Sequence, residues 1–413
     1  MKELAICIPT YERAKFIQEF LEICLPITEQ FDIDVYIYDS SINNDTQIIV
    51  DEYQKITGNL FYNRIDSDVH SNIKVFNIYK QFSKENRYKY IWLSSDYYRF
   101  ESKLIARIKE LININYDVIV VNNSDREPLG SREYTDINQF MIDCAWWTTC
   151  YGSTILNITS MLHNVNWEYM EEKYLGMDCI SFSHAGLYFE QLALINEPRI
   201  YHYSVKDRSF YWSKYRTISG WRDDTFRISC EIWPNVIRKL PDVYIDKSKS
   251  IGKFYVNAGS FKYTLMIGFR KDNIFNLKVF FKYYDFWKYS KLSKFELFKI
   301  AIYPRAYVEN LSDRRIVKFC KKYKTIYIYG TGMVAKRCTK DFERLNIKYD
   351  GYIVSRLRKE ELPDNPKVYE LSPEIISDKK TGIILAVNSF NAKEIMENPL
   401  MKHNKDRVFV YDC

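Results

Sequence analysis

Polar and charged side chains follow four short apolar runs in the first hundred residues of the chain. Carboxylates at such places accept hydrogen bonds from ribose hydroxyls or nucleobase N–H groups, and an arginine pairs well with a phosphate. These side-chain types therefore suit the recognition of a nucleotide. They are Thr10 to Arg13 after the first run, Asp39 after the second, Asp66 or Asp68 after the third, and Asp96 after the fourth.

The elements that position these side chains alternate between strand and helix patterns, which predicts a mostly parallel sheet covered on both faces. Ligands of such open sheets bind beyond the carboxyl ends of the strands, so the polar residues are expected to meet at one edge. Turns also favour Asp for local hydrogen bonding, and that plainer interpretation of the acids stays open. The expected strands are residues 4–8, 35–38, 59–65, 90–93 and 117–121, with helices at about 16–24, from Thr46, at 72–82 and at 103–112.

The composition is that of a soluble globular protein with more than one domain. The chain has 413 residues, of which 46% are hydrophobic and 27% are charged, and this length predicts two or three domains. Its nine cysteines form no CxxC pair, which indicates reduced structural thiols, argues against metal ligation by cysteine and favours a cytoplasmic location. The sequence shows neither a signal peptide nor a run of about 18–20 apolar residues that would span a membrane.

Three motifs of the N-terminal half, taken together, are similar to those of one known family. Ile8 to Arg13 matches an opening motif, Asp39-Ser40-Ser41 an acidic strand end, and Tyr90 to Asp96 a strand that leads into an acidic diphosphate motif. The chain thus resembles the family 2 bacterial glycosyltransferases of the GT-A fold over about half of its length. The resemblance implies an inverting enzyme that moves a sugar (a hexose) from a nucleotide-sugar, of the UDP type, onto a cell-surface glycan or polymer.

The resemblance also implies roles for individual residues. Asp39 would contact the nucleobase, and Asp96 would contact the ribose and diphosphate. The expected nucleotide-sugar contacts are Pro9, Thr10, Tyr11, Arg13, Asp39, Asn72 and Asp96.

The acidic motif departs from the family pattern, because Asp96 is followed by Tyr97, Tyr98 and Arg99. Mg²⁺ and Mn²⁺ prefer carboxylate and water oxygens, and tyrosine is a poor ligand for them. Either Asp96 holds a metal alone with the diphosphate, or Arg99 and neighbouring cations replace the metal, or the site is inactive. We expect weak or absent dependence on a divalent cation. Other protein cations that can serve the diphosphate are Arg13, Arg64 and Lys74.

Inverting transfer needs a base that removes the acceptor proton, and in the resembled family this base lies downstream of the acidic motif. Asp178 fits that arrangement best, with His184 as the alternative and Glu190 nearby. The neighbours of Asp178 are largely apolar, so burial is expected to raise its pKa and strengthen it as a base. A structural role is the open alternative for Asp178 and His184. Trp146, Trp147 and Tyr151 are candidates for stacking on acceptor sugars, with core packing as the alternative for at least one Trp.

A second α/β pattern occupies the C-terminal part, with strands at 326–329, 347–354 and 382–387 and a helix at 334–345. Gly330-Thr331-Gly332 stands between strand and helix, which is the context of a dinucleotide fingerprint. The next strand ends without an acid for a ribose, and Asp350 falls inside it, so we expect no NAD. The chain is therefore divided into a GT-A-like domain (1–203), a helical, basic and aromatic-rich region (204–322) and a Rossmann-like domain (323–413) with a structural, regulatory or assembly role.

The positive charge of the chain is concentrated in one segment. Residues 262–324 carry a net charge of +11, whereas the whole chain carries +7 and the remainder therefore −4. Lysines mixed with aromatic residues suit an anionic membrane surface or an anionic polymer, while a solvated basic face is the plain alternative. Expected partners are thus a nucleotide-sugar donor, a glycan, lipid-linked or teichoic-acid-like acceptor and, peripherally, the inner face of the cell membrane, but not nucleic acid, for which no motif is present.

Two rival functions remain open at this stage. One is a non-catalytic scaffold derived from a glycosyltransferase, which Tyr97 and Tyr98 in place of acids support. The other is a nucleotide-sugar-modifying oxidoreductase that uses the Gly330 turn, although no Tyr-x-x-x-Lys pair follows that turn.

Overall fold

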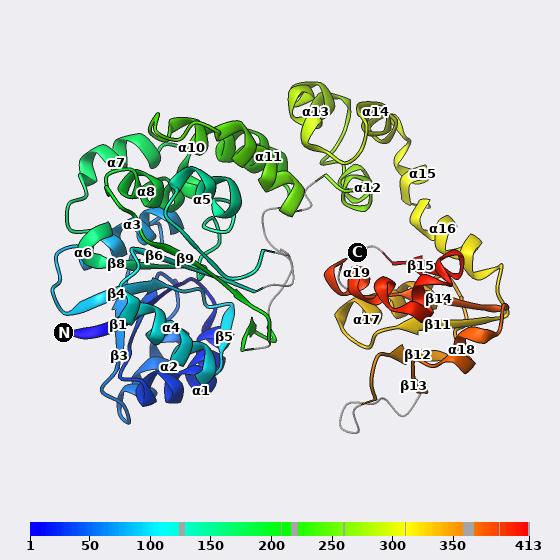
Figure 1. Cartoon of the computed structure of the whole chain (residues 1–413), viewed down its shortest axis with the longest axis horizontal. Coiled ribbons are helices and arrows are strands. Elements are labelled where there is room, and N and C mark those ends of the chain that lie inside the picture. Colours follow the sequence, from blue (N-terminus) through cyan, green and yellow to red (C-terminus); the bar gives the residue numbers. More distant parts are fainter. Residues whose placement is uncertain are drawn as a thin grey trace. The chain divides into compact units, whose positions relative to one another are not determined.

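The computed structural model describes residues 1–123, 129–207, 209–215, 222–258, 261–309, 311–357, 367–387 and 389–411. The chain forms two compact units, Met1–Ala258 and Gly259–Cys413, and each contains its own sheet (Figure 1). The boundary falls inside residues 204–322, so the region that the sequence marks as helical and basic is shared between the two units. The division into three domains stays a prediction.

The first unit is built on an eight-stranded sheet with the order β3-β2-β1-β4-β8-β6-β9-β7. Strands β1 to β4 are mutually parallel, and β8 runs antiparallel to both of its neighbours. This confirms the mostly parallel α/β sheet that the sequence predicts. The strands are β1 (Lys2–Thr10), β2 (Asp34–Asp39), β3 (Leu60–Arg64), β4 (Tyr88–Leu93), β6 (Val118–Asn123), β7 (Arg132–Tyr134), β8 (Thr154–Asn157) and β9 (Ile200–Val205).

Helices cover both faces of this sheet: in Figure 1, α1, α2 and α4 lie on one side, and α3, α5 and α8 lie on the other. Helix α2 begins at Asp45 after Asn44, so Thr46 is inside the helix and not its cap. The helices are α1 (Ala14–Gln30), α2 (Asp45–Gln54), α3 (Ser71–Phe82), α4 (Ser102–Ile114), α5 (Ile137–Cys144), α6 (Ile158–Met161), α7 (Trp167–Tyr174), η2 (Ile180–Phe182), α8 (Ser183–Leu192), α9 (Thr225–Arg227), η3 (Ile228–Ile232), α10 (Trp233–Lys239) and α11 (Lys247–Ala258).

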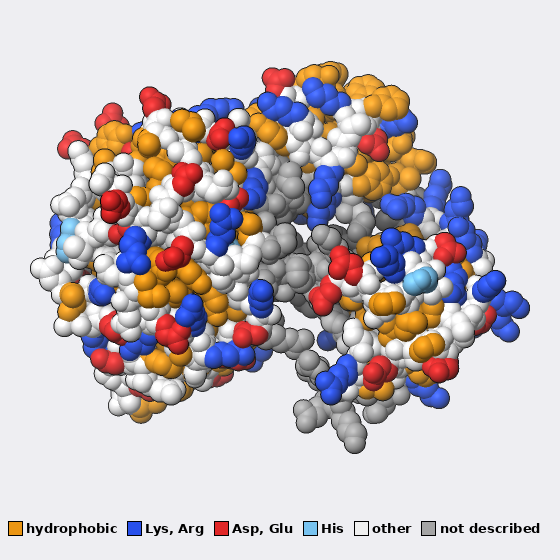
Figure 2. Space-filling view, in the orientation of Figure 1, with side chains coloured by type: hydrophobic (Ala, Val, Ile, Leu, Met, Phe, Trp, Pro, Cys, Tyr) orange, Lys and Arg blue, Asp and Glu red, His pale blue; other side chains and the backbone are white. Residues whose placement is uncertain are grey.

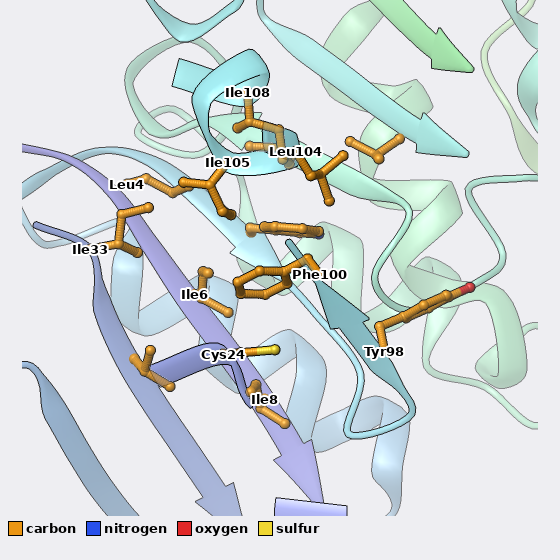
Figure 3. Packing of buried hydrophobic residues seen from close by; sticks show 14 of the residues in the cluster. Leu4, Ile6, Ile8, Cys24, Ile33, Tyr98, Phe100, Leu104, Ile105 and Ile108 are labelled. Atoms are coloured by element: carbon orange, nitrogen blue, oxygen red, sulfur yellow. The ribbon is translucent and has the colours of Figure 1, made fainter. Parts of the chain in front are cut away.

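The core under α1 and α4 fixes the position of β1. Successive side chains of a strand point to opposite faces, so Leu4, Ile6 and Ile8 face the same way. They pack against Cys24 of α1 and Leu104 of α4, and all five are fully buried (Figure 3). Burying each large aliphatic side chain contributes about 1.5–3 kcal/mol. The end of β1, where the polar residues begin, is therefore firmly placed.

A two-stranded ribbon that the sequence did not predict closes over the same region. Strand β5 (Tyr98–Phe100) pairs antiparallel with β10 (Phe210–Trp212). Tyr98 stacks on Phe210 and Trp212, with ring centroids 4.3 and 4.5 Å apart. Gly152 permits this packing, because its φ is +91° and a Cβ there would lie 2.5 Å from the Tyr98 ring. Tyr98 is thus a core residue.

The second unit contains a five-stranded, fully parallel sheet with the order β13-β12-β11-β14-β15, the order of a doubly wound fold. Strand β12 is shorter than predicted and begins at Gly351, so Asp350 precedes the strand instead of lying inside it. The strands are β11 (Thr325–Tyr329), β12 (Gly351–Val354), β13 (Val368–Glu370), β14 (Thr381–Leu385) and β15 (Val408–Val410).

Helices also precede and connect the strands of the second unit, and together with α11 they confirm the helical pattern that the sequence shows over residues 247–318. Among the described residues, no helix is both long enough and apolar enough to span a bilayer. The helices are α12 (Tyr263–Lys271), α13 (Leu277–Lys282), η4 (Tyr284–Tyr289), α14 (Lys294–Ile302), α15 (Arg305–Glu309), α16 (Leu311–Cys320), α17 (Met333–Arg344), α18 (Pro373–Ser377), α19 (Ser389–Glu397), α20 (Pro399–Lys402) and η5 (Lys405–Arg407).

Candidate nucleotide site

The carboxyl ends of β2, β1 and β4 form one edge of the first sheet, because these strands are adjacent and parallel. Thr10 ends β1 and stands in register with Asp39, which ends β2. Asp96 lies just beyond β4, and its Oδ2 accepts a hydrogen bond from Thr10 Oγ1 at 2.9 Å. The structure therefore brings three of the polar strand ends together. We call Thr10, Arg13, Asp39, Lys74 and Asp96 the rim cluster.

Asp96 is a buried carboxylate that one charged and one neutral donor hold in place. Arg13 Nη1 donates to Oδ1 at 3.0 Å, while Thr10 donates to Oδ2. Burial raises the pKa of Asp96, and the Arg13 guanidinium and the Thr10 hydroxyl act in the opposite direction. In this conformation the carboxylate therefore serves chiefly to orient Arg13.

Arg13 is oriented and yet accessible. Its side chain is 37% exposed, although it is paired with a carboxylate that is almost fully buried. The guanidinium carbon lies 4.3 Å from the centroid of the Tyr97 ring, a cation–π contact that the sequence did not predict. Phe16 flanks the same group at 5.7 Å. A planar cation held in this way presents its remaining N–H groups to an incoming phosphate.

Asp39 is fully buried and is surrounded by donors of the protein. Its Oδ1 accepts from the amide and the hydroxyl of Ser41, and its Oδ2 accepts from the Tyr62 hydroxyl at 2.9 Å and from Arg64 at 3.4 Å. A carboxylate offers about four acceptor positions, and all four are used here. A nucleobase N–H can reach Asp39 only by displacing a donor, and Arg64 makes the longest of these contacts.

The loop after β2 is clamped from two sides. Arg64 donates to the carbonyl oxygens of Ser41, Ile42 and Asn43. Glu12, which adopts a left-handed backbone with a φ of 54°, accepts from the Ile42 amide at 2.7 Å and from the Asn43 side chain at 2.8 Å. Arg64 therefore serves this loop in the structure. The sequence offered one usable signal for the clamp, the acid in the motif Thr10-Tyr11-Glu12-Arg13.

Lys74 is a buried cation between the two carboxylates. Its Nζ donates to the backbone oxygen of Thr10 at 2.7 Å and to Ser40 Oγ at 2.8 Å, which ties α3 to the ends of β1 and β2. Burial lowers the pKa of Lys74 to about 8, although the charges of Asp39 and Asp96 favour its protonated form. At neutral pH Lys74 therefore adds a second positive charge to the rim cluster beside that of Arg13.

Three further predicted contacts border the rim cluster. Pro9 is a half-buried residue of β1, and Tyr11 is 46% exposed just after that strand. Asn72 is buried at the start of α3, two residues before Lys74, and its side-chain oxygen accepts a hydrogen bond from the Tyr151 hydroxyl. Asp66 and Asp68, by contrast, are exposed in the segment after β3.

Arg99 does not have the environment of a diphosphate ligand. The residue is fully buried, and its guanidinium pairs with Glu19 of α1 at 2.8 Å and donates to the backbone oxygens of Asp96, Tyr98 and Phe16. It therefore ties β5 to α1. The alternative in which Arg99 replaces a metal is wrong for this conformation, because its donors are directed at the protein.

The environment of Asp178 differs from the expected one. Its side chain is 47% exposed and pairs with Lys239 of α10 at 2.8 Å. This ion pair lowers the pKa of Asp178, so the predicted activation by burial is wrong. The apolar neighbours Cys179, Ile180 and Phe182 are buried, but they point into the core and leave the carboxylate outside. Sequence neighbours in a turn do not share a common environment.

The other acceptor-side candidates are buried. His184 is 1% exposed, and burial lowers its pKa to about 4, so the imidazole is neutral at physiological pH. Its ring contacts Tyr151, whose hydroxyl reaches Asn72. Glu190 accepts from Lys173 and from the Tyr174 hydroxyl. Trp146 and Trp147 are buried with ring centroids 3.7 Å apart, which favours core packing over acceptor stacking for both.

The rim cluster does not offer the ligand set of a divalent cation. Both oxygens of Asp96 already accept from protein donors, and Asp39 is saturated by Ser41, Tyr62 and Arg64. In the described part of the chain, no group of three His, Cys, Asp or Glu side chains is placed to hold a metal. Mg²⁺ and Mn²⁺ need several oxygen ligands with little competition, so the residues present fit an arginine better than a metal.

The glycine turn of the second unit is shaped by packing. Gly330 has a φ of +105°, and a Cβ there would lie 2.8 Å from Val387 and 3.0 Å from the Ala386 oxygen. Asp350 accepts from the Ile326 amide, at the opposite end of β11 from this turn. It therefore supports the sheet and lies far from where a ribose would bind.

Comparison with known proteins gives matches among solved structures alone. No family model matches the chain, and no curated protein matches it. Residues 1–349 of TarS from S. aureus in complex with UDP are similar, with 16% identity, coverage of 65% of this chain and 74% of that one, and a TM-score of 0.41. A Pyrobaculum calidifontis mannosyltransferase with GDP-Man and Mn²⁺ matches at 10% identity, coverage of 76% and 87%, and a TM-score of 0.37.

Glucosyl-3-phosphoglycerate synthase from Mycobacterium tuberculosis, in complex with Mn²⁺ and UDP-glucose, is similar at 8% identity. The similarity covers 58% of this chain and 80% of that one, with a TM-score of 0.38. At these identities and scores, the similarities assign no substrate and no residue role to this chain.

Proposed function

We propose that the first unit is a glycosyltransferase that takes a hexose from a nucleotide-sugar, of the UDP type, and transfers it with inversion. One observation carries the proposal: two buried carboxylates, Asp39 and Asp96, stand at the carboxyl ends of β2 and β4 on either side of Thr10. Open α/β sheets bind nucleotides at this edge. The motif resemblance of residues 8–13, 39–41 and 90–96 supports the same assignment.

In the proposed complex, Arg13 is the principal partner of the diphosphate. It is exposed enough to reach a ligand, and Asp96 and Tyr97 fix its direction. When the bond between the anomeric carbon and the diphosphate breaks, negative charge grows on the leaving oxygen. A positioned cation stabilises that charge. Lys74 is buried within the rim cluster. It therefore adds positive potential to the site without an exposed side chain.

The nucleobase is proposed to lie over the loop after β2. An N–H of the base would take the place of Arg64 on Asp39 Oδ2, since that 3.4 Å contact is longer than the 2.9 Å bond from Tyr62. Asn72 and Tyr11 would then border the donor. We further propose a cell-surface glycan or polymer as acceptor, whose hydroxyl oxygen attacks the anomeric carbon while Asp178 takes the proton.

The donor proposal is tested by binding of UDP-, GDP-, CDP- and TDP-sugars to the full chain, measured by thermal shift and calorimetry with and without Mn²⁺. A ligand that binds only the folded state raises its melting temperature. We expect Asp39→Asn and Asp96→Asn to weaken binding of the preferred donor at least tenfold.

Asp34→Asn is the matched control, because Asp34 is a buried carboxylate at the opposite end of the same strand as Asp39. Unchanged affinity in folded Asp39→Asn and Asp96→Asn proteins would place the nucleotide elsewhere. Tight donor binding without transfer to any acceptor would instead favour the non-catalytic scaffold.

A further inference from the structure

An exposed face of α13, η4 and α14 combines large hydrophobic side chains with lysines. Phe281 and Phe295 are 62% and 65% exposed, which is unusual for phenylalanine. Figure 2 shows hydrophobic side chains gathered over these helices with Lys and Arg side chains beside them. We call this face, with Leu277, Phe281, Tyr284, Phe295 and Ile302, the aromatic patch.

The core of the helical region is already complete without these residues. Trp287 lies at its centre, in ring contact with Phe261, Phe275 and Phe280, and its indole nitrogen donates to the Phe280 oxygen at 2.7 Å. All four aromatic residues are buried. Because neighbouring residues of a helix point in different directions, Phe280 turns inward and Phe281 turns outward. The exposure of Phe281 is thus a property of this surface and not of a poorly packed core.

The exposed residues of the two helices belong to one surface. Lys294 of α14 lies over the ring of Tyr284 at 3.6 Å, which joins the start of α14 to η4. The rings of Phe281 and Tyr284 each form a T-shaped pair with the ring of Phe280, which pairs in the same way with Phe298 of α14. Along α14, Phe295 and Ile302 are seven residues apart and therefore share a helix face.

The charge around the aromatic patch is complementary to an anionic surface. Residues 277–302 contain six lysines and two acids, a net charge of +4. The lysines are Lys278, Lys282, Lys288, Lys291, Lys294 and Lys299, and all but the half-buried Lys294 are exposed. Lysines alone would serve any soluble polyanion, but exposed phenylalanine gains free energy only where apolar surface leaves water.

We infer that the aromatic patch docks the chain on an anionic lipid bilayer, with Phe281 and Phe295 entering the headgroup boundary and the lysines contacting anionic headgroups. Amphipathic surfaces of this composition bind by buried apolar area together with attraction to anionic lipid. The inference is independent of the proposed transferase activity, because the patch lies in the second unit and shares no residue with the rim cluster.

The experiment is co-sedimentation of the full chain with vesicles of phosphatidylcholine alone or with about one third phosphatidylglycerol, at low and high salt. We expect binding to the phosphatidylglycerol vesicles that weakens with salt. Lys282→Glu with Lys299→Glu should lower the partition coefficient well over tenfold, because the loss of each lysine costs a few-fold and each new glutamate is repelled by the surface as well. Phe281→Ser with Phe295→Ser should also abolish most of the binding, at both salt concentrations.

Matched controls separate the patch from general charge and hydrophobicity. Lys318→Glu with Lys321→Glu makes the same charge change on exposed lysines outside the patch, and Ile48→Ser with Ile56→Ser removes exposed apolar side chains from the first unit. Both control proteins should bind vesicles as the unmodified chain does. Three outcomes would overturn the inference: no vesicle binding, binding to soluble polyphosphate but not to vesicles, or a dimer in solution that the Phe281 and Phe295 changes dissociate.

Discussion

At the scale of single residues, Arg13 pairs with Asp96, the one acid of the segment that resembles the family's diphosphate motif. Asp96 accepts its hydrogen bond at 3.0 Å, and Tyr97 and Phe16 support its flat guanidinium. The two aromatic rings thus hold an arginine in place, as additional carboxylates would hold a metal. Under the proposed function, this exchange of a metal for an arginine explains the tyrosine after Asp96 and is compatible with an active site.

The first prediction follows from this exchange. Transfer or donor hydrolysis by the unmodified chain should be unchanged within about twofold when EDTA replaces Mn²⁺, because Arg13 supplies the cation. Arg13→Gln should lower kcat/KM on the order of a hundredfold, and Arg13→Lys should recover only part of it, since lysine lacks the planar fork. Steady-state kinetics with and without EDTA measure both effects. Complete loss of activity in EDTA, restored by Mn²⁺, would contradict the prediction.

The second prediction concerns Lys74. Burial places its pKa at about 8, so affinity for a UDP-sugar should fall as the pH rises from 7 to 9 and the ammonium loses its proton. The titration of Lys74 does not itself destabilise the folded chain. The folded-state pKa lies below the ordinary value of 10.5, so the folded chain binds fewer protons between these values and Lys74 favours folding as the pH rises through this window.

Lys74→Arg is the control for that titration, since arginine keeps its charge throughout the range. Calorimetric Kd values should then be nearly independent of pH if the variant folds normally, which circular dichroism checks. The same fall in affinity in Lys74→Arg would assign the titration to another group, including the nucleobase.

The third prediction concerns Asp178 as the proposed base. Asp178→Asn should lower kcat on the order of a hundredfold while donor affinity is retained. Because the Lys239 ion pair lowers the pKa of Asp178, Lys239→Met should raise it and move the acid limb of kcat/KM to higher pH. Glu172→Gln, which changes an exposed acid of α7, is the matched control and should be active. Normal turnover by Asp178→Asn, with loss in His184→Gln or Glu190→Gln, would move the assignment to that residue.

At the scale of elements, the ribbon of β5 and β10 holds the segment that follows Asp96 against α1. Arg99 of β5 is fully buried, and Glu19 of α1 accepts from Arg99, from the Ser213 hydroxyl and from the Lys214 amide. Burial alone would raise the pKa of Glu19, but these three donors lower it, so the carboxylate is ionised. The pair therefore joins three segments that are distant in the sequence.

The fourth prediction tests this ion pair. Arg99→Met leaves Glu19 buried without its charge partner and should destabilise the first unit by about 3–5 kcal/mol, whereas Arg99→Met with Glu19→Leu should cost less than the sum of the single changes. Urea unfolding followed by tryptophan fluorescence measures this, because seven of the eight tryptophans belong to Met1–Ala258. Additive effects of the two changes would show that the charges do not act as a pair.

The sequence predicted elements well where apolar periodicity is strong and poorly where contacts are distant. The runs at 4–8, 35–38 and 90–93 lie inside β1, β2 and β4, because such runs are buried wherever the sheet forms. The strand β10 was missed, since its three residues are defined only by pairing with β5 across more than a hundred positions. The environment of Asp178 could not be predicted for the same reason, because its carboxylate pairs with Lys239 of α10, a later helix.

At the scale of the whole molecule, the proposed reaction site and the excess positive charge belong to different units. The rim cluster belongs to Met1–Ala258, whereas the aromatic patch and the glycine turn belong to Gly259–Cys413. The remainder outside residues 262–324 carries a net charge of −4, so the positive potential expected for binding an anionic surface is confined to the second unit. Each unit has its own sheet and core, and their roles can therefore be tested by separate substitutions.

The fifth prediction concerns the second sheet, which we propose serves structure, regulation or assembly and not the transfer reaction. Two glycines of one turn separate a packing role of this turn from a ligand-binding role. A Cβ on Gly332 meets nothing within 4 Å, so Gly332→Val should fold normally while filling the space at the start of α17. Gly330 has a φ of +105° and close contacts, so Gly330→Val should destabilise the second unit itself.

We expect Gly332→Val to keep the turnover and the nucleotide-sugar Kd of the unmodified chain within about twofold. Gly330→Val should lower the melting temperature of the second unit, and its donor Kd should be preserved because the rim cluster lies in the other unit. Calorimetry and steady-state kinetics on both variants provide the comparison. The purified chain should also contain no NAD(P), which mass spectrometry of a denatured sample measures. Bound NAD(P), or loss of turnover in a normally folded Gly332→Val protein, would place a functional ligand at the glycine turn and return the oxidoreductase to consideration.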